Sequence, residues 1–133
     1  MALMLDSNII IYSLLPGHEK LREFIATNLP AFSAISYVEV LGFHGIAAVD
    51  RDSFVQLFDG LELLEIDRPT LERAVSLRQQ RKMSLGDSII AATALVRDRV
   101  LLTRNIEDFR WVAGLRLENP MDSPAAPGSP PQA

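Results

Sequence analysis

Short runs of consecutive apolar residues, each followed by a small polar residue, constrain the fold of this chain more than any other feature. Residues 2–5 lead directly to Asp6, and residues 100–102 lead to Thr103. An uninterrupted apolar run is typical of a strand that is buried on both faces of a parallel sheet. The two runs therefore predict inner strands whose carboxyl ends carry polar side chains.

Segments with helical spacing alternate with these runs. Leu21, Phe24 and Ile25 recur at helical spacing before Pro30, and an alanine-rich segment follows Asp87. We expect further strands at residues 31–35, 61–66 and 115–117, and helices near residues 9–15, 18–28, 36–44, 52–59, 69–77, 89–95 and 105–112.

Strands that alternate with helices indicate an α/β fold, a three-layer α/β/α sandwich with a mostly parallel central sheet. In such a sheet, ligands bind beyond the carboxyl ends of the strands, where the strand order reverses. Asp6 and residues 103–105 each follow a predicted strand. We therefore expect the functional site at this edge of the sheet.

The composition fits one globular domain, which we place at residues 1–120, with a flexible tail rich in Pro, Ala and Ser at 121–133. With 133 residues and 48% hydrophobic content, the chain can bury a core without disulfides. The absence of cysteine excludes thiolate zinc sites and cysteine nucleophiles, and it favours a reducing cytoplasm. No apolar run approaches the roughly 20 residues of a membrane span, so no membrane partner is expected.

The charge of the chain is divided unevenly. A formal net charge of -4 speaks mildly against a nucleic-acid-binding protein. Acidic residues dominate up to Asp67, however, whereas residues 68–118 are net basic. The basic half is either a set of solvated helix faces or a side that binds RNA.

Three carboxylates stand where strands end or helices begin, and each has a structural alternative. Asp6 ends a buried strand but is also a good helix N-cap. Glu39 in Ser36-x-x-Glu39 and Asp87 in Ser84-x-x-Asp87 both match the capping-box pattern. Taken one at a time, these residues are explained as well or better by capping.

Taken together, the three carboxylates indicate a divalent metal site. All three are expected at helix N-termini along one edge of the sheet, where the helix dipoles offset only part of their repulsion. A carboxylate set without histidine favours Mg²⁺ or Mn²⁺ over zinc. His18 and His44 have no partner at metal-ligand spacing, and no glycine-rich phosphate loop occurs.

Four sequence blocks, in this order, resemble the PIN-domain family. They are LMLDSN at 3–8, SYVEVLG at 36–42, SLGDSIIAATA at 84–94 and LLTRNIEDF at 101–109. Each block is moderately specific, but four of them in the right order along residues 3–120 make a strong match. The chain is most similar to the VapC toxins of bacterial and archaeal toxin–antitoxin modules.

The resemblance implies roles for five residues. Asp6 and Asp87 would be the main Mg²⁺ ligands, and Glu39 a ligand or a carboxylate that acts through water. Asn105 falls where many PIN nucleases have a fourth acidic residue, so a second metal ion should bind more weakly. Asp108, one helical turn later, is either the replacement carboxylate or a surface residue beside Phe109.

The resemblance also implies a function, the Mg²⁺-dependent hydrolysis of RNA phosphodiester bonds by a toxin. Its partners would be the RNA substrate, a cognate antitoxin that inserts a basic side chain into the acidic site, and a second copy of the chain in a homodimer. Arg104 or another arginine of the basic half would contact the RNA. Thr103 and Asn8 would position water or substrate.

Two other functions remain open at this point. A PIN-like module that has lost catalysis and only binds RNA or a partner is motivated by Asn105. A receiver-like signalling domain also places aspartates around Mg²⁺. The sequence speaks against the second, because Asp6 is followed by Ser7 and Asn8 and no lysine follows Lys82.

Overall fold

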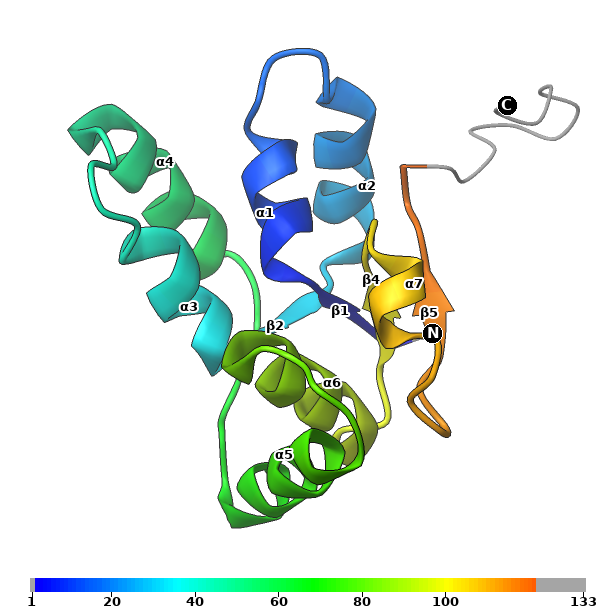
Figure 1. Cartoon of the computed structure of the whole chain (residues 1–133). Coiled ribbons are helices and arrows are strands. Elements are labelled where there is room, and N and C mark those ends of the chain that lie inside the picture. Colours follow the sequence, from blue (N-terminus) through cyan, green and yellow to red (C-terminus); the bar gives the residue numbers. More distant parts are fainter. Residues whose placement is uncertain (1, 122–133) are drawn as a thin grey trace, which may run out of the picture.

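The computed structural model describes residues 2–121, so nearly all of the predicted tail lies outside the described residues. A five-stranded sheet with the order β3-β2-β1-β4-β5 forms the centre of the molecule (Figure 1). Every pair of neighbouring strands is parallel, which confirms and sharpens the predicted architecture. The strands are β1 (Leu3–Leu5), β2 (Ala31–Ser33), β3 (Leu63–Leu64), β4 (Val100–Leu102) and β5 (Leu117–Glu118).

Helices cover both faces of the sheet (Figure 1). They are α1 (Ser7–Ser13), α2 (Glu19–Asn28), α3 (Ala34–Leu41), α4 (Ala48–Asp59), α5 (Arg68–Gln80), α6 (Leu85–Val96) and α7 (Ile106–Phe109). All of the predicted elements exist, with shifted ends. The chain turns into α3 directly after β2 because Ser33 caps the helix by accepting a hydrogen bond from the Ile35 amide.

Two separate cores define the three layers. Met4 of β1 points to the core shared with α5, α6 and α7, whereas Leu3 and Leu5 point to the core shared with α1, α2, α3 and α4. Side chains alternate between the faces of a strand, so an apolar run such as Leu3–Leu5 feeds both cores at once. This is why continuous apolar runs, rather than alternating ones, mark the inner strands.

The connections place a switch point at β1. From β1 the chain moves to β2 on one side, and it returns much later to β4 on the other side. The segments that follow β1 and β4 therefore begin next to each other and then diverge. The backbone amide of Asp6 joins the two strand ends by donating a hydrogen bond to the Leu102 carbonyl. The strand order thus reverses at the edge of the sheet where the sequence predicted the functional site. Within residues 2–121, no helix combines the length and the apolar character that crossing a bilayer requires.

Candidate active site

Asp6 and Thr103 meet across the switch point. The hydroxyl of Thr103 donates a 2.8 Å hydrogen bond to Oδ2 of Asp6, and both side chains are buried. The Asn105 amide in turn donates to the Thr103 hydroxyl at 3.0 Å. This chain of hydrogen bonds fixes the Asp6 carboxylate in one orientation. Thr103 was expected to position water or substrate, and the contact that the structure shows for it is this one with the Asp6 carboxylate.

The environment of Asp6 is costly for a negative charge. Its side chain makes no capping hydrogen bond with α1, although Asp6 occupies the N-cap position. Burial raises the pKa of Asp6 to about 6, and repulsion from Asp87 and Glu39 adds to the rise, while the hydrogen bond from Thr103 opposes it. Capping therefore does not explain this carboxylate.

Glu39 is held by two serines, not by a capping box. Helix α3 begins at Ala34 with Ser33 as its N-cap, so Glu39 lies in the second turn and the predicted Ser36 cap is wrong. The Ser7 hydroxyl donates to Oε1 of Glu39 at 2.7 Å and lies 2.8 Å from the Ser36 hydroxyl. A hydroxyl has one hydrogen to donate, so Ser36 donates to Ser7. The relay runs from Ser36 through Ser7 to Glu39.

Gly86 leaves the space in which the Glu39 carboxylate lies. A Cβ added at Gly86 would be 3.0 Å from Cδ of Glu39 and would overlap Oε2. A glycine in the first turn of a helix costs up to about 1 kcal/mol relative to alanine. Here the glycine lets α3 and α6 approach each other, which brings Glu39 next to Asp87.

Asp87 lies in the first turn of α6, and its neighbour Ser84 is a true N-cap that accepts a 3.1 Å hydrogen bond from the Asp87 amide. The cap uses the backbone of Asp87, and Ser84 also interacts with the Asp87 carboxylate. Burial raises the pKa of Asp87, a contact with Ser84 opposes the rise, and repulsion from Asp108 and Glu39 adds to it. The serine in the capping pattern is structural, whereas the aspartate belongs to the acidic site.

Asn105 and Asp108 differ in what they contribute. Asn105 is exposed and holds Thr103 through its backbone amide. Asp108 follows one turn later, where its amide donates to the Asn105 carbonyl, and its carboxylate repels that of Asp87. The structure thus brings the exposed Asp108 close enough to Asp87 for the two charges to interact.

We call Asp6, Glu39, Asp87 and Asp108 the acidic cluster. Its members come from four different segments and affect one another's charge. Within residues 2–121, the side chains do not form a ready-made set of three metal ligands.

Sequence reasoning missed Ser7, Ser36 and Gly86 as site residues. Ser36 stands three residues before Glu39 and therefore shares its helix face, which is a usable signal. Gly86 next to Asp87 is a second signal, because glycine inside a helix usually marks a close approach. Nothing local links Ser7 to Glu39, since the two are 32 residues apart. Asn8, which was expected to position water, is exposed beside the site.

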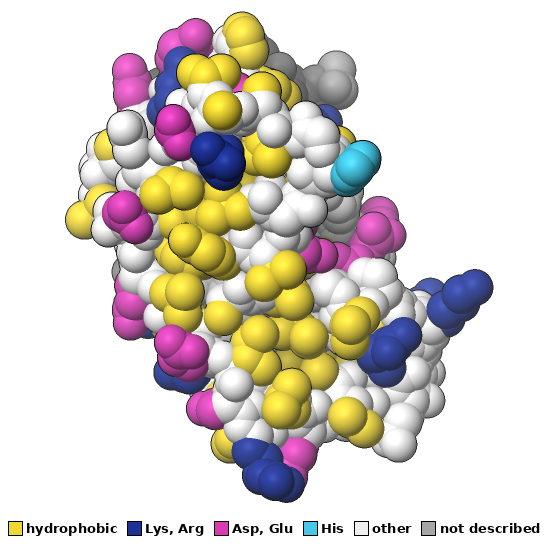
Figure 2. Space-filling view, turned by 90° about the vertical axis from the view of Figure 1, so that its left-hand side faces the viewer, with side chains coloured by type: hydrophobic (Ala, Val, Ile, Leu, Met, Phe, Trp, Pro, Cys, Tyr) yellow, Lys and Arg dark blue, Asp and Glu magenta, His cyan; other side chains and the backbone are white. Residues whose placement is uncertain are grey.

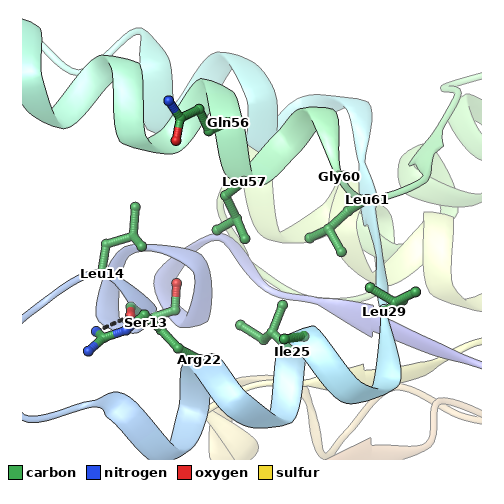
Figure 3. Close-up of a pocket in the computed structure, with 10 residues that line it drawn as sticks. Ser13, Leu14, Arg22, Ile25, Leu29, Gln56, Leu57, Gly60 and Leu61 are labelled. Carbon is green, nitrogen blue, oxygen red and sulfur yellow. Dashed lines mark hydrogen bonds between the residues drawn. The ribbon is translucent and has the colours of Figure 1, made fainter.

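A groove lies apart from the acidic cluster, between α1, α2 and α4. Its volume is about 280 Å³, and its lining is mainly apolar. Ile25 of α2 and Leu57 of α4 point toward each other across it (Figure 3). At one end, Arg22 donates a hydrogen bond to the Ser13 carbonyl at 2.8 Å.

An apolar face covers the side of the molecule where α3, α4 and α5 lie. Figure 2 shows hydrophobic side chains gathered in a band across this side. The large apolar residues exposed on these helices are Tyr37, Val38, Val49, Leu71 and Val75. We call these five residues the apolar face.

Comparison with known proteins agrees with this geometry. The model of the PIN domain matches residues 3–115, which span β1, β4 and every member of the acidic cluster. The chain belongs to the PIN domain family. Among curated proteins, no sequence matches it.

Several solved structures share the PIN fold seen here. A toxin–antitoxin complex from Klebsiella pneumoniae contains a chain with 29% identity and a TM-score of 0.69, covering 86% of this chain and 95% of that one. A chain of the DNA-bound VapBC from Salmonella typhimurium is 26% identical with a TM-score of 0.77, and the match covers 90% of this chain and 98% of that one. A chain of VapBC-1 from nontypeable Haemophilus influenzae is 25% identical with a TM-score of 0.74, and the match covers 90% of this chain and 98% of that one. The PIN domain of this chain is thus similar over nearly its whole length to chains of toxin–antitoxin complexes.

Proposed function

We propose that this PIN domain is a Mg²⁺-dependent endoribonuclease and the toxin of a VapBC-type toxin–antitoxin module. The observation that carries the proposal is the acidic cluster at the switch point, where a buried aspartate with a raised pKa lies among carboxylates that repel it. No cationic side chain forms an ion pair with the cluster within residues 2–121. A site that concentrates negative charge at a cost to stability is characteristic of function.

The donor set fits a hard divalent cation. Asp6 and Asp87 would hold Mg²⁺, with Mn²⁺ able to substitute, and Glu39 would act as a ligand or through water. When bound, the ion supplies Lewis-acid activation of the phosphodiester and of the attacking water. Asp108 would supply the carboxylate that Asn105 lacks.

The protein's own residues orient the carboxylates. Thr103 holds Oδ2 of Asp6, so Oδ1 would be the oxygen that faces a cation in the proposed site. Ser7 holds Oε1 of Glu39, which leaves Oε2 directed at Gly86 and the start of α6. Each carboxylate thus keeps one oxygen for the structure and offers the other to the site, where it can hold a cation or accept a proton.

Cleavage of a mixed cellular RNA pool tests the proposal, with Mg²⁺, Mn²⁺ and EDTA compared. We expect metal-dependent fragments from the wild type and none from Asp87→Asn. Asp59→Asn is the matched control, because Asp59 is exposed and precedes β3 at the opposite edge of the sheet. Equal cleavage by Asp87→Asn and the wild type would reject the site.

Asn105 motivates a second candidate, a PIN module that binds RNA without cleaving it. This candidate predicts RNA binding by the folded wild type but no turnover under any metal. Asn105→Asp separates the two candidates. For a weakened nuclease, the added carboxylate should strengthen the metal dependence of cleavage.

We propose that the antitoxin binds in the groove between α1, α2 and α4, in addition to the basic side chain that the family resemblance expects it to insert into the acidic cluster. The groove is apolar and half open, so an amphipathic segment would bury its apolar side chains between Ile25 and Leu57. Leu57→Asp should abolish capture of the co-expressed antitoxin while cleavage by the free toxin is retained. Retained capture would exclude this groove. The similarity to chains of toxin–antitoxin complexes motivates this partner.

We also propose a homodimer through the apolar face. Side chains such as Val38 and Val75 are exposed by 64% and 56%, which is unusual for a surface without a partner. Light scattering at micromolar concentration should give twice the monomer mass of 14.7 kDa, and Val75→Glu should give the monomer mass. A monomeric wild type would remove the dimer.

A further inference from the structure

Arg104 is held by an aromatic ring at the edge of the acidic site. Its guanidinium carbon lies 4.6 Å from the centre of the Tyr12 ring, and the side chain is exposed. A cation–π contact fixes the position of a guanidinium without cancelling its charge. His18 lies beside the same ring, with 5.8 Å between ring centres.

The backbone ties this arginine to the acidic cluster. Arg104 stands between Thr103, whose hydroxyl holds Asp6, and Asn105, whose amide holds Thr103. Tyr12 is on α1, which begins immediately after Asp6. Six residues of helix span about 9 Å along the axis, so the Tyr12 ring lies within a few nucleotide steps of the carboxylates.

Most other arginines in residues 2–121 are neutralised by a carboxylate, whereas Arg104 is not. No ion pair involves Arg104 within this part of the chain, although the acidic cluster is near. Arginines that do form ion pairs are Arg22, Arg51, Arg68, Arg97, Arg99, Arg110 and Arg116. The Arg104 charge is therefore available to an anion that reaches the site.

An RNA strand needs such a charge here. The chain has a net charge of -4, and its acidic cluster repels phosphate. A guanidinium offers several N–H donors in a planar fork that matches phosphate oxygens, and a ring that stacks on one face leaves this fork free. We propose that Arg104, held on Tyr12, binds a phosphate of single-stranded RNA next to the bond that the site cleaves.

This proposal rests on the proposed nuclease function only for the position of the phosphate next to the cleaved bond, because RNA binding can be measured without cleavage. The probe is a fluorescein-labelled single-stranded RNA of mixed sequence, followed by fluorescence anisotropy in EDTA over a range of KCl concentrations. Arg104→Gln should weaken binding about tenfold and reduce the slope of log K against log salt by about 0.7. Arg104→Lys should keep the salt slope but lose affinity, because the planar fork is lost.

Three matched variants separate the contribution of the arginine charge from that of the aromatic ring beneath it. Arg116→Gln removes the same charge at the opposite edge of the sheet, where Arg116 pairs with Asp98 at 2.8 Å, and it should bind like the wild type. Tyr12→Leu removes the ring and keeps the arginine, so it should lose part of the affinity, whereas Tyr12→Phe should not. Circular dichroism would show that each variant is folded.

The outcomes distinguish this inference from the proposed function. Equal RNA affinity and salt slope for Arg104→Gln and Arg116→Gln would overturn it, even if the wild type cleaves RNA. It would also be overturned if Arg104→Gln weakened only the complex with the antitoxin. A selective loss in Arg104→Gln would support it, even if no metal ion gives cleavage, and would then favour the RNA-binding module.

Discussion

We predict that removing the buried carboxylate of Asp6 stabilises the metal-free fold, whereas most substitutions of buried residues destabilise a protein. Asp6 is 3% exposed and has a pKa of about 6 instead of its ordinary 3.8. Asn at this position has nearly the same shape, can still accept the hydrogen bond from Thr103, and carries no charge. Asp6→Asn should therefore raise the free energy of unfolding at neutral pH.

The size and the sign of this change in the free energy of unfolding follow from proton linkage. In the pH range between 3.8 and about 6, the folded protein keeps the proton on Asp6 while the unfolded chain has released it, so stability falls as pH rises. At about 1.4 kcal/mol per pKa unit, the full penalty is about 3 kcal/mol and is reached above pH 6. The variant avoids this penalty. Its advantage should be about 3 kcal/mol at pH 7.5 and close to zero at pH 4.

Urea unfolding in EDTA, followed by the fluorescence of the single tryptophan, Trp111, measures the difference. Asp67→Asn is the control with the opposite sign. Asp67 caps α5 by accepting from the Thr70 amide and hydroxyl, and these hydrogen bonds, with the nearby Arg97, lower its pKa. Its replacement should lower stability at pH 7.5.

Two results would refute the reasoning. The first is a loss of stability in Asp6→Asn at pH 7.5, as in the control, since it would mean that the carboxylate is stabilised where it lies. The second is an equal gain at pH 4 and pH 7.5, because a gain that does not depend on pH cannot come from the ionised form of Asp6.

Three further predictions address the metal, the close approach at Gly86 and the core. Adding Mg²⁺ at pH 7.5 should stabilise the wild type, by about 2.7 kcal/mol at 100 times its Kd, but not Asp6→Asn, and equal melting temperatures with and without Mg²⁺ would contradict this. Gly86→Ala should lower metal-dependent RNA cleavage about tenfold, because the added Cβ overlaps Glu39. Gly60→Ala is the control and should be neutral, since its Cβ would be 3.6 Å from the nearest atom. Equal activity of the two variants would refute the steric argument. Phe32→Ala, which removes a fully buried ring that packs on Phe58 at 4.6 Å, should cost about 3–5 kcal/mol in urea unfolding, and a loss below 1 kcal/mol would show that the core collapses around it.

The acidic cluster carries a cost in stability that we propose its nuclease function requires. Residues of the two cores are packed at close to zero exposure around the sheet, whereas Asp6 is buried with a charge that has no cationic partner among the described residues. Natural proteins keep such costs where activity requires them. The stability series proposed above would measure this cost directly.

Local sequence features predicted the elements well where a single signal dominates. The apolar runs before Asp6 and Thr103 marked β1 and β4, and Gly60 marked the end of α4. Ends set by competing signals were less accurate. Helix α7 stops at Phe109, three residues before the predicted end at residue 112, and the chain then turns at Gly114, which has a φ of +81°, before β5 pairs with β4.

The same limit applies to the capping patterns. Ser84-x-x-Asp87 and Ser36-x-x-Glu39 look alike in sequence, yet only Ser84 begins a helix as its N-cap. The difference lies in Ser33, which starts α3 one turn earlier than the pattern suggests. Two equivalent local signals cannot be ranked without knowledge of where the preceding strand ends.

Local features of the sequence were enough to predict the fold class, because periodicity and strand ends are local properties of the chain, and they singled out the carboxylates that the fold gathers into the acidic cluster. Tertiary structure alone decided which side chains hold those carboxylates. Ser7 meets Glu39 across 32 residues and Thr103 meets Asp6 across 97, and Arg104 lies on Tyr12 rather than on an acidic neighbour. Such contacts depend on how strands pair and helices cross, and these long-range arrangements leave no periodic trace in the sequence.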